Sequence, residues 1–325
     1  MKPLTFKILR ELADGEFHSG EKMAQALAVS RASVCQALQG VEEAGLPVFK
    51  VHGRGYRLPQ PVQWLDAKKI RAALGRRAGH FDLEVLESVE STNTLLLQKG
   101  ALGAASGSVI AAEWQAHGRG RRGREWHAGL GGALTFSLLW RFPQGAGFLS
   151  GLSLVVGVAL LRALQKLGAT DVQLKWPNDI LWRHRKLGGI LIELQGDMLG
   201  PSAAVIGIGL NVNLSDSVRA KIDQAVSDLQ SACGAQIDRN AALAALLAEL
   251  DEALALFAQS GFEPFREEWQ RHHAYQEKNV TLRLADGGSE QGKVAGVAQD
   301  GSLLLQTRGG MKRYHGGEIS LRAAK

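Results

Sequence analysis

The stretch that decides how this sequence is interpreted is Gly-Arg-Gly-Arg-Arg-Gly-Arg at residues 118–124, with Gln115 shortly before it. Glycines let a backbone approach a ligand closely and adopt positive φ angles. Arginines supply planar, permanently charged donors that match phosphate and carboxylate oxygens. The stretch is not a Walker phosphate loop, because no Gly-Lys-Ser/Thr follows it. Taken alone, it fits an anion-binding loop, a flexible basic surface loop or a nucleic-acid patch.

The composition of the whole chain is that of a folded protein with two or three domains. Its 325 residues are 45% hydrophobic and 22% charged, which excludes a disordered or fibrous chain. A net charge of +6 permits an anionic partner without requiring one. The longest apolar run, residues 148–161, is shorter than the ~20 residues of a membrane span, so we expect no membrane partner.

The two cysteines and the N-terminus predict where the protein resides. Cys35 and Cys233 are too few for a disulfide framework or a zinc site. The N-terminus has no signal-peptide core, because Lys7 and Arg10 interrupt its apolar residues. We therefore expect a cytoplasmic protein.

Residues 1–61 predict a winged helix-turn-helix domain. Apolar residues recur at helical spacing in three short segments, and Ser19 and Ser30 can cap the second and third. Gly45 is placed to end the third helix. Two short strands around a glycine turn then form a hairpin, expected at residues 48–52 and 56–58. Three helices and a hairpin in this length have the shape of a winged helix.

The rest of the chain predicts two further domains of different character. Residues 65–275 mix apolar strands with two apolar helices, at 149–167 and around 243–257. Residues 278–325 carry short strands separated by Asp-Gly turns, which predicts a small all-β barrel. The central strands are expected at 83–89, 108–113, 132–140, 172–175, 188–194 and 203–212. The C-terminal strands are expected at 280–284, 292–297, 302–306 and 311–314.

A second polar motif, Lys-Trp-Pro-Asn-Asp at residues 175–179, is followed by Lys186 and a glycine pair. A lysine at a strand start beside glycines can hold a carboxylate or a phosphate. Asp179 can help hold Mg²⁺ near a nucleotide. The alternative is that residues 176–179 are an ordinary turn, which these residue types favour, and that Lys186 is solvated.

Two shorter motifs leave similar alternatives. The hydroxyls and amide of residues 91–93 follow a strand and can bind a polar ligand, although Ser, Thr and Asn are also ordinary helix caps. Gly207 and Gly209 alternate along a strand, which indicates that a ligand or another strand approaches the backbone closely there.

In order and spacing, these motifs together resemble those of biotin–protein ligases of the bifunctional kind, which also repress the biotin operon. The resemblance extends over nearly the whole chain. Its most specific parts are the Gly/Arg stretch at residues 118–124, which we call the arginine loop, and Lys-Trp-Pro-Asn-Asp. The matching motifs are Ser-Thr-Asn at 91–93, Gln115 with the loop at 118–123, Trp126, residues 175–179, Lys186 with Gly-Gly-Ile-Leu, and Gly-Ile-Gly-Leu-Asn at 207–211.

The resemblance implies an α+β protein with three parts. These are an N-terminal winged helix-turn-helix, a central mixed-sheet catalytic domain related to class II aminoacyl-tRNA synthetases, and a C-terminal SH3-like barrel. It implies that biotin and ATP, with Mg²⁺, form biotinyl-5′-AMP. The biotin then passes to a lysine of a biotin carboxyl carrier protein domain. The adenylate-bound protein of this family is a homodimer that represses transcription at operator DNA.

The resemblance also assigns roles to residues. Lys186, Arg121 and Arg119 are the catalytic candidates, and Asp179 is the candidate for positioning Mg²⁺. The expected biotin-binding residues are Ser91, Thr92, Asn93, Gln115, Arg119, Gly120, Arg121, Lys186 and Gly189. The expected adenylate- or ATP-binding residues are Arg122, Trp126, Lys175, Asn178 and Asn211.

For the N-terminal domain, DNA contacts are expected from Ser30, Arg31, Ser33, Gln36, Gln39 and Arg54. A winged helix can also dock on proteins, and the weak positive charge of this part leaves that alternative open. Two other whole-chain functions are also open: a related ligase for lipoate or another acid, and a ligand-sensing regulator without ligase activity. The arginine loop and Lys-Trp-Pro-Asn-Asp favour biotin over lipoate, and an intact Lys186 argues against a pure regulator.

Overall fold

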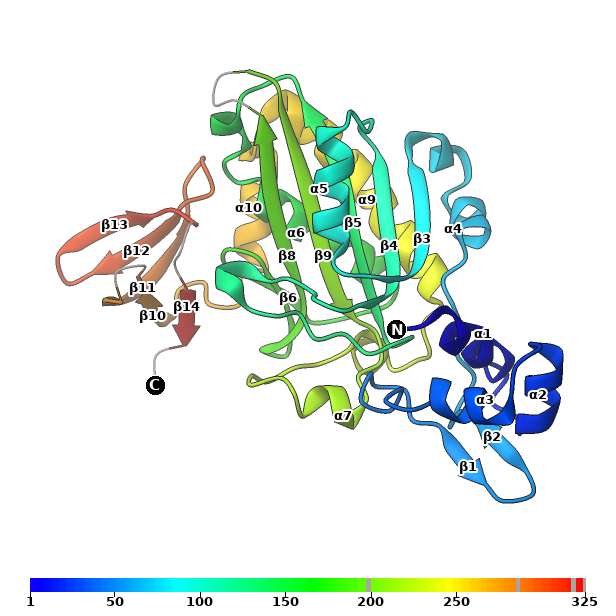
Figure 1. Cartoon of the computed structure of the whole chain (residues 1–325). Helices are drawn as coiled ribbons and strands as arrows, with labels where there is room; N and C mark the ends of the chain where they lie inside the picture. Colours follow the sequence, from blue (N-terminus) through cyan, green and yellow to red (C-terminus); the bar gives the residue numbers. More distant parts are fainter. Residues whose placement is uncertain (197–199, 285–286, 317–319, 324–325) are drawn as a thin grey trace.

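The computed structural model describes residues 1–196, 200–284, 287–316 and 320–323. The chain forms a helical N-terminal unit, a central seven-stranded sheet covered by helices, and a C-terminal five-stranded antiparallel sheet (Figure 1). The predicted α+β class is confirmed, with a mixed central sheet and an all-β C-terminal unit. No helix in the described ranges is long and apolar enough to cross a membrane.

The N-terminal unit has the predicted three helices and hairpin. Ser19 caps the second helix by accepting a hydrogen bond from the Lys22 amide, and Ser30 caps the third in the same way, from Ser33. The third helix ends well before Gly45, because Gly40 takes a φ of +77° and turns the chain. The elements are α1 (Pro3–Glu11), α2 (Gly20–Ala26), α3 (Arg31–Ala37), β1 (Phe49–Val51) and β2 (Gly55–Arg57).

The N-terminal unit packs directly on the central unit. Leu130, from the central unit, is 2% exposed and belongs to the apolar cluster of the N-terminal helices. Its amide donates a 2.8 Å hydrogen bond to the Ala44 carbonyl. The segment at residues 62–66, which connects the two units, is held by a buried ion pair of the central unit. In this pair Arg239 Nη2 lies 2.8 Å from Glu113 Oε2. Glu113 also accepts from the Leu65 amide, and Arg239 donates to the Gln63 carbonyl.

Replacing Glu113 by glutamine should lower the free energy of unfolding by about 3 kcal/mol, because it leaves the Arg239 charge buried without its counter-charge. Denaturant unfolding measures this change. Glu84→Gln is the matched control, since Glu84 pairs with Lys99 at the surface and should change stability by less than about 1 kcal/mol. A loss below 1 kcal/mol for Glu113→Gln would contradict the assigned role.

The central sheet has the order β3-β4-β5-β9-β8-β7-β6. Only β3 and β4 run parallel, and all other neighbours are antiparallel. All six predicted strands occur, with ends shifted by a few residues. The structure adds β7, which was not predicted and begins at Asp179, the last residue of the Lys-Trp-Pro-Asn-Asp motif. The strands are β3 (Asp82–Val89), β4 (Ser108–Gln115), β5 (Ala133–Phe142), β6 (Val172–Lys175), β7 (Asp179–Trp182), β8 (Arg185–Gly196) and β9 (Ser202–Asn211).

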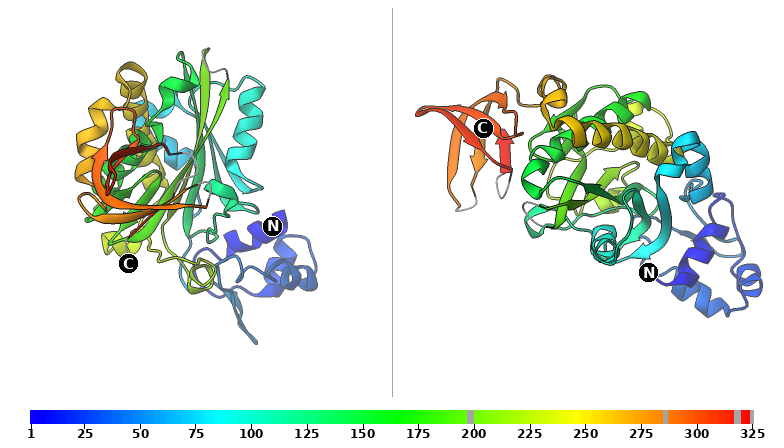
Figure 2. Two further views of the ribbon diagram at one scale, coloured as in Figure 1. Left: turned by 90° about the vertical axis from the view of Figure 1, so that its left-hand side faces the viewer. Right: turned by 90° about the horizontal axis from the view of Figure 1, so that it is seen from above.

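Helices cover both faces of this sheet (Figure 2). The main apolar core lies between one face and the long helices α6 and α9, together with α4 and α10. On the other face, α5 packs through a small cluster around Leu96. The helix predicted at 149–167 begins later, since Gly151 with φ +83° precedes it. The helices are α4 (Ala67–Leu74), α5 (Thr92–Ala101), α6 (Leu152–Lys166), α7 (Asp216–Arg219), α8 (Leu229–Cys233), α9 (Arg239–Ser260) and α10 (Glu263–Arg271).

The C-terminal sheet has the order β13-β12-β11-β10-β14. The four predicted strands are confirmed, and a fifth, β14, pairs antiparallel with β10 at the edge. The strands are β10 (Asn279–Arg283), β11 (Ser289–Val297), β12 (Leu303–Thr307), β13 (Gly310–Tyr314) and β14 (Ser320–Ala323).

Candidate active site

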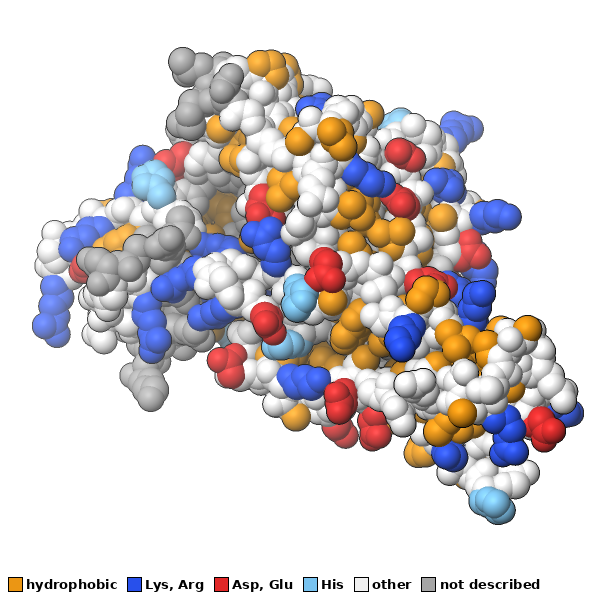
Figure 3. Space-filling view, viewed as in Figure 1, with side chains coloured by type: hydrophobic (Ala, Val, Ile, Leu, Met, Phe, Trp, Pro, Cys, Tyr) orange, Lys and Arg blue, Asp and Glu red, His pale blue; other side chains and the backbone are white. Residues whose placement is uncertain are grey.

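A cavity of about 520 Å³ opens on the central sheet, beside the C-terminal unit. Its walls come from the start of α5, the arginine loop, the segment before β7, strands β8 and β9, and the segment at residues 221–226. Lys and Arg side chains gather on this side of the molecule (Figure 3). Every residue predicted to bind biotin, adenylate or Mg²⁺ lines the cavity: Ser91, Thr92, Asn93, Gln115, Arg119, Gly120, Arg121, Arg122, Trp126, Lys175, Asn178, Asp179, Lys186, Gly189 and Asn211.

A partly buried charge cluster lines the cavity. Lys186 Nζ lies 2.7 Å from Asp179 Oδ1, and Lys175 Nζ lies 3.5 Å from Asp179 Oδ2. Burial alone would raise the pKa of the Asp179 carboxyl, but the two ammonium groups outweigh it and lower that pKa. Asp179 is therefore ionised at neutral pH and holds both lysines in place. Its oxygens are already paired with cations, so it does not fit direct coordination of Mg²⁺.

The arginine loop is a tight turn whose ends are hydrogen-bonded. The Gly120 amide donates to the Arg124 carbonyl at 2.7 Å, and the Trp126 amide donates to the Gly118 carbonyl at 2.8 Å. A Cβ on Gly118 would lie 2.5 Å from the Trp126 carbonyl oxygen, so only glycine fits there. These contacts give the loop a defined backbone conformation, which argues against the flexible-loop alternative.

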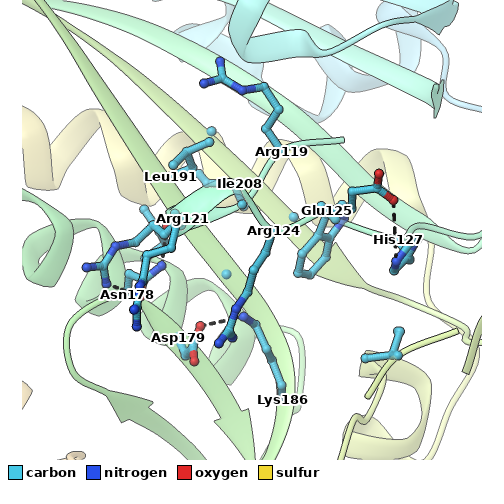
Figure 4. A pocket seen from close by; sticks show the side chains of 18 of the residues that line it. Arg119, Arg121, Arg124, Glu125, His127, Asn178, Asp179, Lys186, Leu191 and Ile208 are labelled. Carbon is cyan, nitrogen blue, oxygen red and sulfur yellow. Dashed lines mark hydrogen bonds and ion pairs between the residues drawn. The ribbon is translucent and has the colours of Figure 1, made fainter. Parts of the chain in front are cut away.

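Arg121 joins the loop to the segment before β7 and to the C-terminal unit. Its Nη1 donates to Asn178 Oδ1 at 3.0 Å, and its Nη2 donates to the carbonyl of Gly316 in the C-terminal unit. Burial lowers the pKa of this guanidinium, and the nearby Asp179 carboxylate opposes that effect. Arg124, which was not among the predicted residues, points toward Asp179 and Lys186 (Figure 4). Its position in the same Gly/Arg stretch was the only signal for it.

A polar network forms the opposite end of the cavity. Ser91 caps α5, as the helix-cap alternative predicted, and this leaves Thr92 and Asn93 facing inward. Gln115 Oε1 accepts hydrogen bonds from the amide and hydroxyl of Thr92, at 2.8 and 3.1 Å. The Ser137 hydroxyl lies 2.7 Å from Thr92 Oγ1 and 2.5 Å from Asn93 Oδ1. Sequence reasoning missed Ser137, because a serine in an apolar strand carries no motif.

The alternating glycines of β9 make room for two side chains that line the cavity. A Cβ on Gly207 would lie 2.1 Å from Asn93 Oδ1, and one on Gly209 would lie 2.3 Å from the Trp126 indole. The close approach predicted at these glycines occurs, but the approaching groups are side chains of this chain. The glycines therefore set the positions of Asn93 and Trp126.

Asn211, at the end of β9, uses the NH₂ group of its side-chain amide in hydrogen bonding but not the carbonyl oxygen. Its Nδ2 donates to the Ser227 carbonyl at 3.0 Å, whereas its buried Oδ1 has no hydrogen-bond partner among the described residues. A buried acceptor without a partner is costly in a folded protein. A ligand with an N–H group would satisfy it.

The residues predicted to contact DNA lie in the N-terminal unit, away from the cavity. Five of the six are exposed and Ser33 is half-buried; the exposed residues are Ser30, Arg31, Gln36, Gln39 and Arg54. The hydroxyls of Ser30 and Ser33 lie 2.9 Å apart in the cap of α3. Arg54 lies over the Phe17 ring, with its guanidinium carbon 4.0 Å from the ring centre; a contact with DNA would use a guanidinium that is already stacked. Gln39 lies just beyond the last residue of α3.

Comparisons with known proteins agree with this organisation. A model described as the biotin/lipoate A/B protein ligase family matches residues 85–213. A model of an HTH domain matches residues 5–57, and one of the biotin protein ligase C-terminal domain matches residues 277–322.

Individual relatives match over most of their length. The bifunctional ligase/repressor BirA of Escherichia coli is 41% identical over 98% of this chain and 97% of its own. The corresponding protein of Bacillus spizizenii is 30% identical over 95% of each chain. A solved structure of the biotin protein ligase from Aquifex aeolicus, in complex with biotin and ATP, has a TM-score of 0.64 and 30% identity; it covers 74% of this chain and 99% of that one.

Proposed function

This chain belongs to the family of bifunctional biotin ligase/repressors and is a biotin–protein ligase, and from that premise we propose how its residues carry out the reaction. The observation that carries the proposal is that Lys186, the arginine loop and the polar network line one cavity. We propose that a carboxylate and a triphosphate meet beside Lys186 and that the polar network binds the biotin ring. We place the three domains at residues 1–61, 65–275 and 278–325. The first would bind DNA, the second would carry out the ligase reaction, and the third would help to close the cavity.

In the first step, a carboxylate oxygen of biotin attacks the α-phosphorus of ATP. A new P–O bond forms, the bond to the β-phosphate oxygen breaks, and pyrophosphate leaves with the electron pair. Two anions must approach each other in this step, so fixed positive charge around them lowers the barrier. We assign that charge to Lys186, Arg121 and Arg124, which lie around Asp179 (Figure 4). No side chain acts as a covalent nucleophile, and positioning supplies the rest of the catalysis.

In the second step, the uncharged ε-amine of a carrier-protein lysine attacks the acyl carbon of biotinyl-5′-AMP. An amide forms, AMP leaves, and the amine loses a proton. Because the acyl-adenylate hydrolyses in water, the cavity has to stay closed until the carrier arrives. The contact between Arg121 and Gly316 supports a closure in which the C-terminal unit takes part.

The two halves of the adenylate would bind at opposite ends of the cavity. Thr92, Asn93 and Gln115 offer donors and acceptors suited to the ureido ring of biotin. The free Oδ1 of Asn211 suits the exocyclic amine of adenine, and the Trp126 indole offers a stacking surface. Because Asp179 is paired with two lysines, we assign Mg²⁺ to the phosphates of ATP rather than to this carboxylate.

Mass spectrometry of the ligand that the purified protein retains tests the substrate. After incubation with biotin and Mg-ATP, we expect biotinyl-5′-AMP on the protein. An adenylate formed with lipoate or another acid, but not with biotin, would keep the fold and overturn the substrate. No adenylate with any acid would favour the pure-regulator alternative.

For the N-terminal unit we propose operator binding by a homodimer loaded with adenylate. One small module contacts few phosphates, and a dimer doubles that footprint. The exposed Arg31 and Gln36 of α3 are the side chains best placed to reach base edges. The free thiols Cys35 and Cys233 fit a reducing cytoplasm, where DNA would be accessible.

Replacing Arg31 or Gln36 by alanine should weaken specific DNA binding roughly 10-fold for each lost base contact. Fluorescence anisotropy measures this on DNA that the adenylate-loaded wild-type protein selects from a random pool. Arg271→Ala is the control, since Arg271 is an exposed residue at the end of α10, outside this unit. Selection of no DNA, or equal affinity of the alanine variants, would favour a protein-docking module instead.

A further inference from the structure

Arg119 and Arg124 belong to the same loop, but their side chains point in different directions. Arg124 points toward Asp179 and Lys186, whereas Arg119 points away from them (Figure 4). Its main partner is the Glu193 carboxylate, from β8, and its Nη1 also lies 3.5 Å from Thr94 Oγ1. Arg119 Nη2 lies 2.9 Å from Glu193 Oε1, and its Nη1 donates to Oε2 at 3.2 Å.

The same carboxylate also contacts the polar network. Glu193 Oε2 accepts a 2.9 Å hydrogen bond from Asn93 Nδ2. The Glu193 side chain is 23% exposed and that of Arg119 is 47% exposed, so water screens this ion pair and its contribution is weak. One carboxylate thus joins the first arginine of the loop to the amide that we assign to biotin binding.

A guanidinium held by two parallel contacts to a carboxylate is in the geometry that it would also use for a phosphate. The two anions therefore compete for Arg119. When Arg119 transfers to a ligand phosphate, Glu193 keeps its hydrogen bond from Asn93 and part of its exposure to water. The exchange does not leave a buried charge without a partner, so it can be reversible.

We propose that Glu193 is a positioning residue that holds Arg119 away from the anion site in the ligand-free protein and competes with the adenylate for it. This inference rests on the proposed function, since it needs an adenylate that Arg119 can bind. Its consequence is that Glu193 weakens the hold on biotinyl-5′-AMP and so sets how readily the loop reopens.

The variant Glu193→Gln removes the charge and keeps an oxygen that can accept from Asn93. We expect biotinyl-5′-AMP to leave the preloaded variant about 2–5-fold more slowly than the wild type, as for loss of one weak ion pair. The KM for ATP should fall without a rise in kcat, and the Kd for biotin alone should stay within 2-fold. A merely structural role would instead raise KM and lower the thermal midpoint.

Two further variants make the test specific. In an Arg119→Ala background, Glu193→Gln should leave the dissociation rate unchanged, and an effect as large as in the wild type would overturn the role assigned through Arg119. Glu84→Gln, at a surface ion pair with Lys99, is the matched control. If the wild type retains adenylate and Glu193→Gln releases it equally fast or faster, this inference alone is overturned. If the wild type forms no adenylate, the proposed function is overturned with it.

Discussion

Replacing Lys186 by methionine should lower the rate of adenylate formation by about 10²–10³-fold, which is the usual effect of removing one preorganised charge from a reacting anion. The expected effect is large because Lys186 has two tasks. It faces the site where carboxylate and phosphate meet, and its Nζ neutralises Asp179 at 2.7 Å. Without it, the Asp179 carboxylate would keep Lys175 at 3.5 Å as its remaining ion-pair partner and would repel both substrates.

Biotin-dependent release of pyrophosphate, measured in a single turnover, reports this rate directly. Adding Asp179→Asn to the Lys186→Met variant separates the two tasks, since it removes the carboxylate charge that Lys186 otherwise neutralises. We expect the double variant to recover part of the lost rate. Lys166→Met is the control, because Lys166 pairs with Glu249, outside the cavity. A Lys186→Met rate within 5-fold of the wild type would contradict the central role of Lys186.

Replacing Arg121 by glycine should release biotinyl-5′-AMP from the protein roughly 100-fold faster. Hydrogen bonds to charged groups contribute about 1.5–3 kcal/mol each, and about 3 kcal/mol for the lost pair corresponds to this factor. The variant loses the contacts that join the loop to Asn178 and to Gly316 of the C-terminal unit. The loop would then no longer close the cavity, and the activated biotin would reach free lysines in solution.

Two measurements check this outcome. The first is the dissociation rate of preformed adenylate, and the second is biotin attached to the lysines of an added bystander protein. Arg308→Gly is the matched control, because Arg308 is an exposed turn residue of the C-terminal unit. Adenylate release and bystander labelling equal to those of the wild type would show that Arg121 does not retain the intermediate.

Much of this protein can be read from local sequence because its motifs are local. The arginine loop, residues 91–93 and residues 175–179 each place several polar groups within a few residues, and all of them line one cavity. Helix caps and glycine turns are also local, and Ser19 and Ser30 cap the helices that they were expected to cap. A strand such as β7 was missed because Asn and Asp favour turns, and pairing with β6 and β8 outweighs that preference here.

The sequence by itself determined the three-part organisation and most strands, since these follow from periodicity and turn chemistry. It also determined the predicted cavity residues, through local motifs and their resemblance to those of biotin–protein ligases. Only the tertiary structure decided that Glu193 holds Arg119, that Ser137 lies between Thr92 and Asn93, and that Leu130 completes the N-terminal core. These contacts join residues far apart in the chain. They depend on the strand order β5-β9-β8 and on how two units pack together, and neither is encoded in any short stretch of residues.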